Sequence, residues 1–180
     1  MMRVARLPFA ATVLVLATAL AGCGILPGPI ANPGVRPDRP EIVEPVLQVA
    51  GGNGPGGPYW AWIYRTRDGM SCLEVTTPGS SGSSCGPDLD GLLGASVSTG
   101  PGGVHVSGGT REPGAHSVRV TLADGSAVGA ALAPVPAIFG APDAGVYVVA
   151  LPANATPVRL DILDESGEVL ETTEFPATRL

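Results

Sequence analysis

The stretch VRVTLADGSAV, residues 118–128, alternates aliphatic and polar residues on both sides of an Asp-Gly turn signal. This alternation is typical of two half-buried strands joined as a β-hairpin. A two-residue loop would mix the two faces of the hairpin, whereas a three-residue loop ending at Gly125 pairs Val120 with Val128. We therefore predict the three-residue loop, with Gly125 in the left-handed conformation that closes a G1 bulge.

A related stretch, VRLDILDESGEVL over residues 158–170, repeats the order Val-Arg-aliphatic-x-aliphatic before a turn that ends in glycine. A three-residue loop here pairs Ile162 with Leu170, and the hydrophobic pattern predicts this register. The same register sets Asp161 opposite Glu171, which is an unfavourable contact between like charges.

A third hairpin is predicted in YWAWIYRTRDGMSCLEV, residues 59–75, which again contains Asp-Gly. A two-residue loop, the register that we predict, would place five large side chains on one face: Trp60, Trp62, Tyr64, Leu73 and Val75. The alternative is a three-residue loop, which would bring Cys72 beside Tyr64 instead.

Short runs of Val, Thr and Leu, separated by Gly, Pro and Asp, continue outside these hairpins. They predict strands near residues 92–98, 104–107 and 145–151, and an edge strand at 46–50 before a glycine-rich break at 51–58. Apolar residues at helical spacing occur in no ten-residue window. We expect an all-β domain, an antiparallel β-sandwich of about seven to nine strands that is immunoglobulin-like in general architecture, with a small β-barrel as the alternative.

The segment before this domain is rich in proline and has no apolar periodicity. Proline-rich chains adopt the extended polyproline II conformation and act as semi-rigid spacers. We therefore expect a signal peptide over 1–22, a tether over 23–45 and the β-sandwich domain over 46–180. At about 3.1 Å per residue, the part of the tether from 23 to 39 would span roughly 50 Å.

The first residues show the organisation of an export signal. Arg3 and Arg6 precede an uncharged run over residues 7–21 that is rich in Ala, Val and Leu. A membrane-spanning helix takes about 20 apolar residues, so this run fits the apolar region of a signal peptide better. One interpretation of this segment is an ordinary secretory signal, in which the cysteine at position 23 is coincidental.

Leu20-Ala21-Gly22-Cys23 resembles the lipobox of bacterial lipoproteins, in which an aliphatic residue and two small residues precede a cysteine. The resemblance implies cleavage after Gly22 and diacylglycerol on the Cys23 thiol, which would anchor the chain to the extracytoplasmic face of the cell membrane. The outer membrane is the alternative location in a diderm host. The lysine-free, Ala-, Gly-, Pro- and Val-rich composition also looks actinobacterial.

The charge of the exported part limits its partners. Loss of two of the ten basic residues leaves eight arginines against 16 acidic residues, a net charge of −8. Such a surface lacks the cationic stripe that binds phosphates, so nucleic acid is not an expected partner. We expect the membrane, through the Cys23 lipid, and a cell-envelope protein or glycan.

The two remaining cysteines, Cys72 and Cys85, form an even pair in an exported chain, which predicts a disulfide. Closing a loop of about 14 residues contributes roughly 3 kcal/mol to stability in the chain-entropy model. Two unpaired thiols are the alternative. Together with His105 and His116 the cysteines form no closely spaced ligand pair, so no metal site is predicted.

Trp60, Trp62 and Tyr64 alternate along one predicted strand. Because the chain has few other large aromatic residues, their first interpretation is as core side chains. The second is a platform on which sugars or peptides stack.

The sequence shows no catalytic arrangement. Residues 82–86 match the pattern Gly-x-Ser-x-Gly, but they do not lie between a strand and a helix, and a surface loop is the simpler interpretation. Several acids cluster on the last predicted hairpin, where a glycosidase could use two of them: Asp161, Asp164, Glu165, Glu168, Glu171 and Glu174. We expect a solvated acidic face instead, and a non-enzymatic interaction module without a cofactor.

Overall fold

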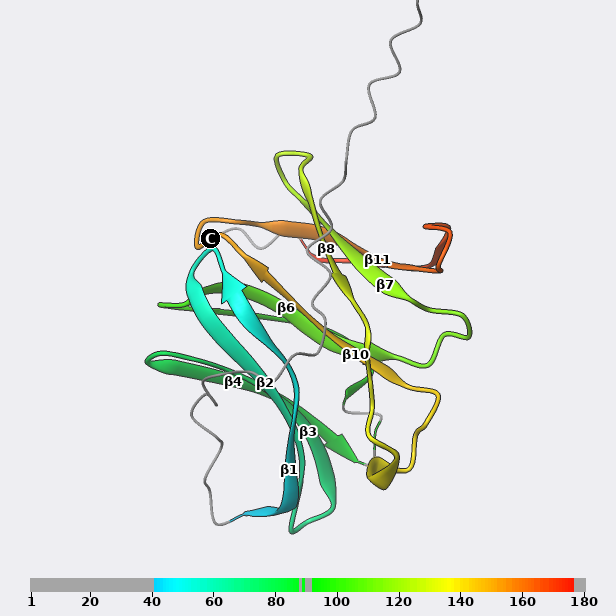
Figure 1. Cartoon of the computed structure of the whole chain (residues 1–180). Helices are drawn as coiled ribbons and strands as arrows, with labels where there is room; N and C mark the ends of the chain where they lie inside the picture. Colours follow the sequence, from blue (N-terminus) through cyan, green and yellow to red (C-terminus); the bar gives the residue numbers. More distant parts are fainter. Residues whose placement is uncertain (1–40, 88, 90–91, 177–180) are drawn as a thin grey trace, which may run out of the picture.

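The protein is described by a computed structural model that covers residues 41–87, 89 and 92–176. In this part of the chain twelve strands form three antiparallel sheets of four strands each, and no helix is long and apolar enough to cross a membrane. Figure 1 shows the sheets packed face to face. The all-β antiparallel architecture is confirmed, with a third sheet and more strands than the seven to nine predicted.

Sheet A contains the first four strands in sequence order, each paired with the next. They are β1 (Ile42–Gly54), β2 (Gly57–Thr66), β3 (Met70–Thr77) and β4 (Ser80–Pro87). The predicted strand 46–50 lies within β1 at the edge of this sheet. The glycine-rich stretch 51–58 is mostly strand, since Gly54 pairs with Gly57 across the tight turn between β1 and β2.

Sheets B and C contain the other eight strands. The order in sheet B is β5 (Gly94–Gly100), β6 (Gly103–Thr110), β10 (Gly145–Leu151) and β9 (Ala133–Pro134). The order in sheet C is β12 (Val169–Glu174), β11 (Pro157–Leu163), β7 (Ser117–Leu122) and β8 (Ala127–Ala131). Only one residue separates β8 from β9, so the chain passes directly from sheet C to sheet B. The fold also includes a sheet that is curled into a half-barrel.

Sheet B is the middle layer, because its side chains contribute to two separate cores. Val146 and Val148 of β10 pack with residues of sheet A, whereas Tyr147 and Val149 pack with residues of sheet C. All eight residues of β6 are buried. Sheets A and C are therefore the outer layers, and each has one face directed away from the cores.

A close approach between β5 and β6 explains one glycine of the middle sheet. A Cβ atom at Gly108 would lie 1.9 Å from the carbonyl oxygen of Gly94. The hydroxyl of Tyr147 donates a hydrogen bond of 2.7 Å to that same oxygen. Any side chain at position 108 would therefore displace β5 and break this bond.

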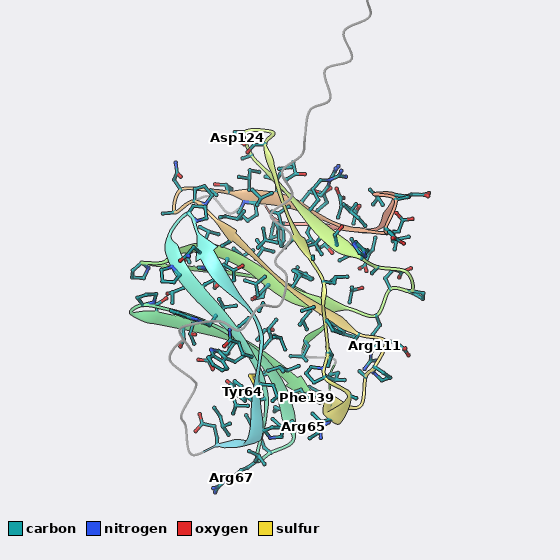
Figure 2. All side chains as sticks on the ribbon, viewed as in Figure 1. Tyr64, Arg65, Arg67, Arg111, Asp124 and Phe139 are labelled. Carbon is teal, nitrogen blue, oxygen red and sulfur yellow. A yellow bond between two sulfur atoms is a disulfide. The ribbon has the colours of Figure 1, made fainter. Side chains whose placement is uncertain are left out.

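A short 3₁₀ helix, η2 (Ala137–Phe139), lies in the connection between β9 and β10 of sheet B. The Arg65 guanidinium of β2 donates a hydrogen bond of 3.0 Å to the Phe139 carbonyl oxygen and lies 5.6 Å from the centroid of its ring. Figure 2 shows the two labelled side chains next to each other. Both contacts hold η2 against β2.

The hairpin of residues 118–128 has the predicted register. Val120 pairs with Val128, and Gly125 has a φ of 84°, in the left-handed region that favours glycine. The Asp124 carboxylate accepts a hydrogen bond from the backbone N–H of Ser126, which further stabilises the turn.

The three-residue loop predicted for residues 158–170 is present, and Leu163 pairs with Val169 in the predicted register. Beyond this pair the prediction is wrong, because a bulge at Leu170 sets Ile162 opposite Glu171. Asp161 therefore faces Thr172 instead of Glu171. The shift replaces a contact between like charges with a side-chain hydrogen bond.

The two-residue loop predicted for the hairpin of 59–75 is also wrong, and the three-residue alternative is correct. Tyr64 pairs with Cys72, and Ile63 pairs with Leu73. Leu73 then points toward sheet B and into the first core, while Tyr64 points to the opposite face. The preferred register failed because it placed Leu73 with the aromatic residues and away from this core.

Candidate functional site

The aromatic residues of β2 form a third cluster on the side of sheet A that faces away from sheet B. Trp62, Tyr64 and Cys72 are its buried members, and Ile42, Val46 and Trp60 pack against them. Their β2 neighbours at the alternate positions, Tyr59, Ala61 and Ile63, belong to the first core. We use the name "aromatic face" for the outward-pointing side chains at the centre of this surface: Trp60, Trp62, Tyr64, Cys72, Glu74 and Thr76.

The aromatic face is as buried as a core. Tyr64 is 1%, Glu74 2% and Trp62 5% exposed, while Trp60 is half-buried. The described residues provide no further sheet beyond this face. The first interpretation from the sequence, core side chains, therefore fits Trp62 and Tyr64, which belong to a small third core, whereas Trp60 is only partly buried.

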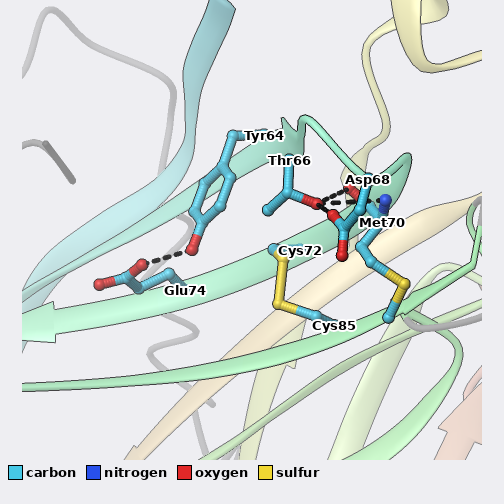
Figure 3. Close-up of a disulfide and its surroundings, with 7 residues drawn as sticks. All are labelled: Tyr64, Thr66, Asp68, Met70, Cys72, Glu74 and Cys85. Atoms are coloured by element: carbon cyan, nitrogen blue, oxygen red, sulfur yellow. Dashed lines mark hydrogen bonds between the residues drawn. A yellow bond between two sulfur atoms is a disulfide. The ribbon is translucent and has the colours of Figure 1, made fainter. Parts of the chain in front are cut away.

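Two hydrogen bonds hold the rings in place. Trp62 Nε1 donates to Thr76 Oγ1 at 3.0 Å, and the Tyr64 hydroxyl donates to Glu74 Oε2 at 2.7 Å. Figure 3 shows the second bond beside the disulfide. A phenol that donates to a buried carboxylate makes a strong, charge-assisted bond, so the Tyr64 ring has a fixed orientation.

The predicted disulfide is present and lies on the same surface. Cys72 of β3 and Cys85 of β4 are direct cross-strand partners with an S–S distance of 2.04 Å (Figure 3). The bond ties the edge strand β4 to the sheet. The surface loop predicted at residues 82–86 is wrong, because these residues form part of strand β4.

The chain enters sheet A beside the aromatic face, at the loop between β2 and β3. The Arg67 backbone N–H donates to the Glu41 carbonyl oxygen at 2.8 Å. Glu41 and Arg67 also line an open cavity of about 570 Å³ together with Met70 and Cys85. The hydrogen bond from the Thr66 hydroxyl lowers the pKa of Asp68 in the same loop.

The two histidines do not meet. His105 is 5% exposed, and its ring centroid lies 5.7 Å from that of Tyr59. Burial lowers the pKa of His105 and favours the neutral imidazole. His116 is exposed and lies just before β7 rather than in a strand. Within residues 41–87, 89 and 92–176, no three His, Cys, Asp or Glu side chains are placed to hold a metal ion.

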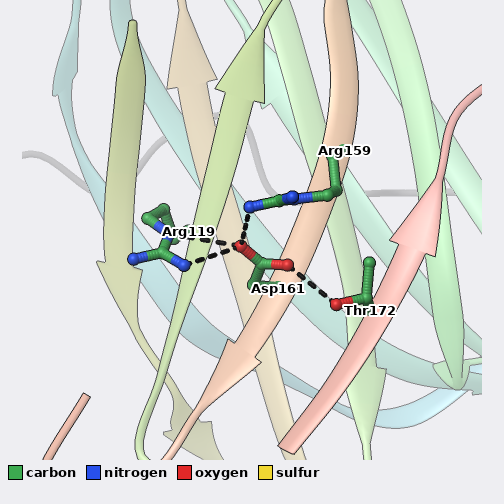
Figure 4. A network of polar contacts seen from close by, with 4 residues as sticks. All are labelled: Arg119, Arg159, Asp161 and Thr172. Atoms are coloured by element: carbon green, nitrogen blue, oxygen red, sulfur yellow. Dashed lines mark hydrogen bonds and ion pairs between the residues drawn. The ribbon is translucent and has the colours of Figure 1, made fainter. Parts of the chain in front are cut away.

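The acids of the last hairpin have separate roles. Asp161, on the outer face of sheet C, accepts hydrogen bonds from Arg119, Arg159 and Thr172, as Figure 4 shows. Asp164 accepts from the backbone N–H of Glu168 within the turn. The remaining acids of the group are exposed: Glu165, Glu168, Glu171 and Glu174.

Glu74 and Thr76 are the members of the aromatic face that sequence reasoning missed. In the correct register Glu74 faces Trp62 and Thr76 faces Trp60, so both share the face of the rings. The alternation Cys-x-Glu-x-Thr after the turn carries this signal, but it can be interpreted only once the loop length is known.

Comparison of the chain with protein-family models, with curated proteins and with solved structures finds no match. Its function is therefore inferred from the molecule itself.

Proposed function

We propose that this protein is a lipid-anchored, extracytoplasmic binding module without enzymatic activity, and that the aromatic face is its binding surface. The observation that supports the proposal is an aromatic cluster on the outermost face of a sheet whose inner face already packs in a complete core. Tryptophan and tyrosine with fixed polar partners are the side chains that dominate binding surfaces.

The ligand that suits this surface is an extended polymer. Trp60 is the ring of this face that remains partly open to solvent, so a ligand that contacts it can continue along the edge of the strand. The apolar faces of sugars and the side chains of peptides both pack on such rings. We propose a glycan or a protein segment of the cell envelope.

Binding should be visible in the intrinsic fluorescence, because Trp60 and Trp62 are the only tryptophans of the chain. Titration of the mature chain with soluble cell-wall glycan or with envelope peptides should shift their emission saturably. Trp60→Ala should weaken binding tenfold or more, judged by calorimetry. Leu170→Ala removes an exposed apolar side chain from sheet C and is the control. Equal affinities of the two variants would count against the aromatic face.

The anchoring part of the proposal concerns Cys23, which lies outside the described residues. Mass spectrometry of protein purified from membranes should find an N-terminal peptide that begins at Cys23 and carries two or three acyl chains. The Cys23→Ser variant should leave the membrane fraction. Detection of Met1, or of an unmodified Cys23, in the membrane-purified protein would disprove the anchor.

A further inference from the structure

We infer that the edge formed by strands β4 and β5 is the contact surface of a symmetric dimer, in which β5 pairs antiparallel with β5 of a second copy of this chain. The inference goes beyond the proposed function, because it concerns the side of the molecule where sheets A and B end.

β4 and β5 are edge strands that lie against each other. Within the residues that the structure describes, β4 pairs only with β3 and β5 only with β6. A Cβ atom at Gly82 of β4 would lie 3.2 Å from the Cβ of Ser98 of β5. Along the outer edge of each strand, alternate residues direct backbone N–H and C=O groups away from the adjoining strand, where another chain can pair with them.

The other edges of the three sheets have features that oppose pairing with another chain. β1 contains Pro45 and two register shifts, and β9 has only two residues, of which the second is Pro134. β12 has a bulge at Leu170 and carries the exposed side chains of Glu171 and Glu174. β8 is separated by one residue from β9, so the chain itself continues from this edge into sheet B.

β4 and β5 lack these features. Residues 80–87 and 94–100 contain no charged residue, and the pairing of both strands is free of register shifts. Their one proline, Pro87, is the last residue of β4. The disulfide of Cys85 holds β4 in the sheet. A regular, uncharged edge of this kind is a template for the addition of another strand.

The sequence of β5 selects a second copy of the chain as the partner. Gly-Ala-Ser-Val-Ser-Thr-Gly over 94–100 reads the same in both directions, apart from the exchange of Ala95 and Thr99. Antiparallel pairing around Val97 therefore places Ser96 opposite Ser98 of the second copy and Val97 opposite its own equivalent. Directly opposite serines form hydrogen bonds, and like apolar side chains pack together.

Val97 provides the apolar centre of this contact. It pairs with Val106 and so lies on the face of sheet B that packs against sheet C, but it is 41% exposed. Directly opposite residues of an antiparallel pair have Cβ atoms about 4.5–5.5 Å apart. Pairing around Val97 therefore removes the two valine side chains from water together.

The same two-fold axis suits β4. Residues 80–84 read Ser-Ser-Gly-Ser-Ser and are symmetric about Gly82, which lies against Ser98, the neighbour of Val97. An axis perpendicular to the sheets at the centre of β5 therefore passes near the centre of β4 as well. Because both copies use the same surface, the contact closes at two chains.

The interface is small, so the dimer should be reversible. Seven residues of a strand span about 24 Å, and two stacked sheets lie about 10 Å apart. A contact of this length and two strands in depth falls below the roughly 1,200 Å² of stable interfaces. We expect a dissociation constant of about 10 to 100 μM.

The symmetry has a consequence for binding. An axis perpendicular to the sheets leaves the two aromatic faces on the same side of the dimer, where one extended polymer can contact both. This consequence rests on the proposed function, whereas the dimer itself does not.

The first experiment measures mass by sedimentation velocity on residues 23–180, with Cys23→Ser to prevent lipidation and thiol cross-links. The mass should rise toward that of two chains as the concentration increases from about 1 to about 500 μM. The mass of a single chain over the whole range would overturn the inference. Species larger than two chains would also overturn it.

The second experiment places a charge on the axis. Val97→Lys should raise the dissociation constant about tenfold or more, because two ammonium groups then face each other. Val169→Lys is the matched control, since Val169 is 43% exposed, also lies on an edge strand, and undergoes the same change of charge. Circular dichroism checks that both variants keep their sheets. Equal dissociation constants for the two variants would contradict the inference.

The third experiment locates the axis. Val97→Glu alone should dimerise as poorly as Val97→Lys, whereas an equimolar mixture of the two should form mixed dimers, because opposite charges then face each other. A mixture of Val169→Lys and Val169→Glu should dimerise no better than either variant alone. If the native chain dimerises and the Val97 mixture does not, pairing around Val97 is refuted.

Failure of the inference and failure of the proposed function can be told apart, because dimerisation is measured without a ligand. A chain that dimerises but binds no envelope polymer supports the inference and refutes the proposed function. A chain that binds polymer but stays monomeric at every concentration supports the proposed function and refutes the dimer.

Discussion

The outer faces of sheets A and C each hold one buried carboxylate, and the two are compensated in different ways. Asp161 on sheet C is 1% exposed, and Glu74 on sheet A is 2% exposed. Asp161 lies between Arg119 at 2.8 Å and Arg159 at 3.1 Å. The neutral hydroxyl of Tyr64 donates a hydrogen bond of 2.7 Å to Glu74.

Several side chains together determine the charge state of Asp161. Burial raises the pKa of Asp161, but hydrogen bonds from Arg119 and Thr172 and the charge of Arg159 outweigh it and hold the pKa below its usual range. The partners of Asp161 are direct cross-strand neighbours or lie on its own strand. The polar residues on the face of sheet C therefore form a network of ion pairs and hydrogen bonds around one carboxylate.

The largest effect is expected for the covalent link on sheet A. Replacing Cys72 and Cys85 by alanine should lower the free energy of unfolding by about 3 kcal/mol, since the unfolded chain gains loop entropy. Urea unfolding of the double variant measures this loss. Thiol labelling of the native protein, folded or denatured, should detect neither cysteine before a reductant is added. An unchanged midpoint would show that β4 contributes little to the fold.

The next effect concerns the charge on sheet C. Asp161→Asn should lower the free energy of unfolding by about 2 kcal/mol at pH 7, because two guanidinium groups lose their anion. This expected loss of stability is smaller than the loss on breaking a fully buried ion pair, because the Arg119 and Arg159 side chains are 39% and 42% exposed. Glu171→Asn is the control. A loss no larger than the control's would mean that the network is only a surface feature.

The pH dependence of stability should come from the same acid. The pKa of Asp161 is lowered in the folded state, so its contribution is complete above the unfolded pKa of about 3.9 and is lost as the pH falls through the folded value. Native protein and Asp161→Asn should therefore converge in stability as the pH falls below about 4. Unfolding curves measured at several pH values test this, and parallel profiles would contradict it.

The smallest effects compare one hydroxyl on each face. Tyr64→Phe removes the donor to Glu74 and should cost about 1.5 kcal/mol, a typical value for a bond to a charged group. Thr172→Val removes one donor to Asp161 and should cost about half as much, because both arginines remain and Thr172 is exposed to water. Equal losses in chemical unfolding would remove the distinction between the two faces.

Local patterns were sufficient to predict the class of fold. Alternation of period two, frequent turn residues and the absence of helical spacing predict antiparallel strands, and the turn at Gly125 follows from its own flanking residues. The pairing of Cys72 with Cys85 follows from the even number of cysteines in the predicted mature domain. In each case neighbouring residues or composition carry the full constraint.

The location of the candidate site required contacts that are distant in the sequence. The Asp-Gly turn of β2 and β3 permits loops of two or three residues, and a shift of one residue turns every side chain to the other face. Burial of Leu73 and Ile63 against sheet B selects the longer loop, which turns Tyr64, Trp62 and Glu74 outward together. Similarly, the bulge at Leu170 forms because Asp161 gains Thr172 as its partner in the sheet. Turn chemistry acts over a few residues, but the choice between registers depends on which side chains the adjoining sheet can bury.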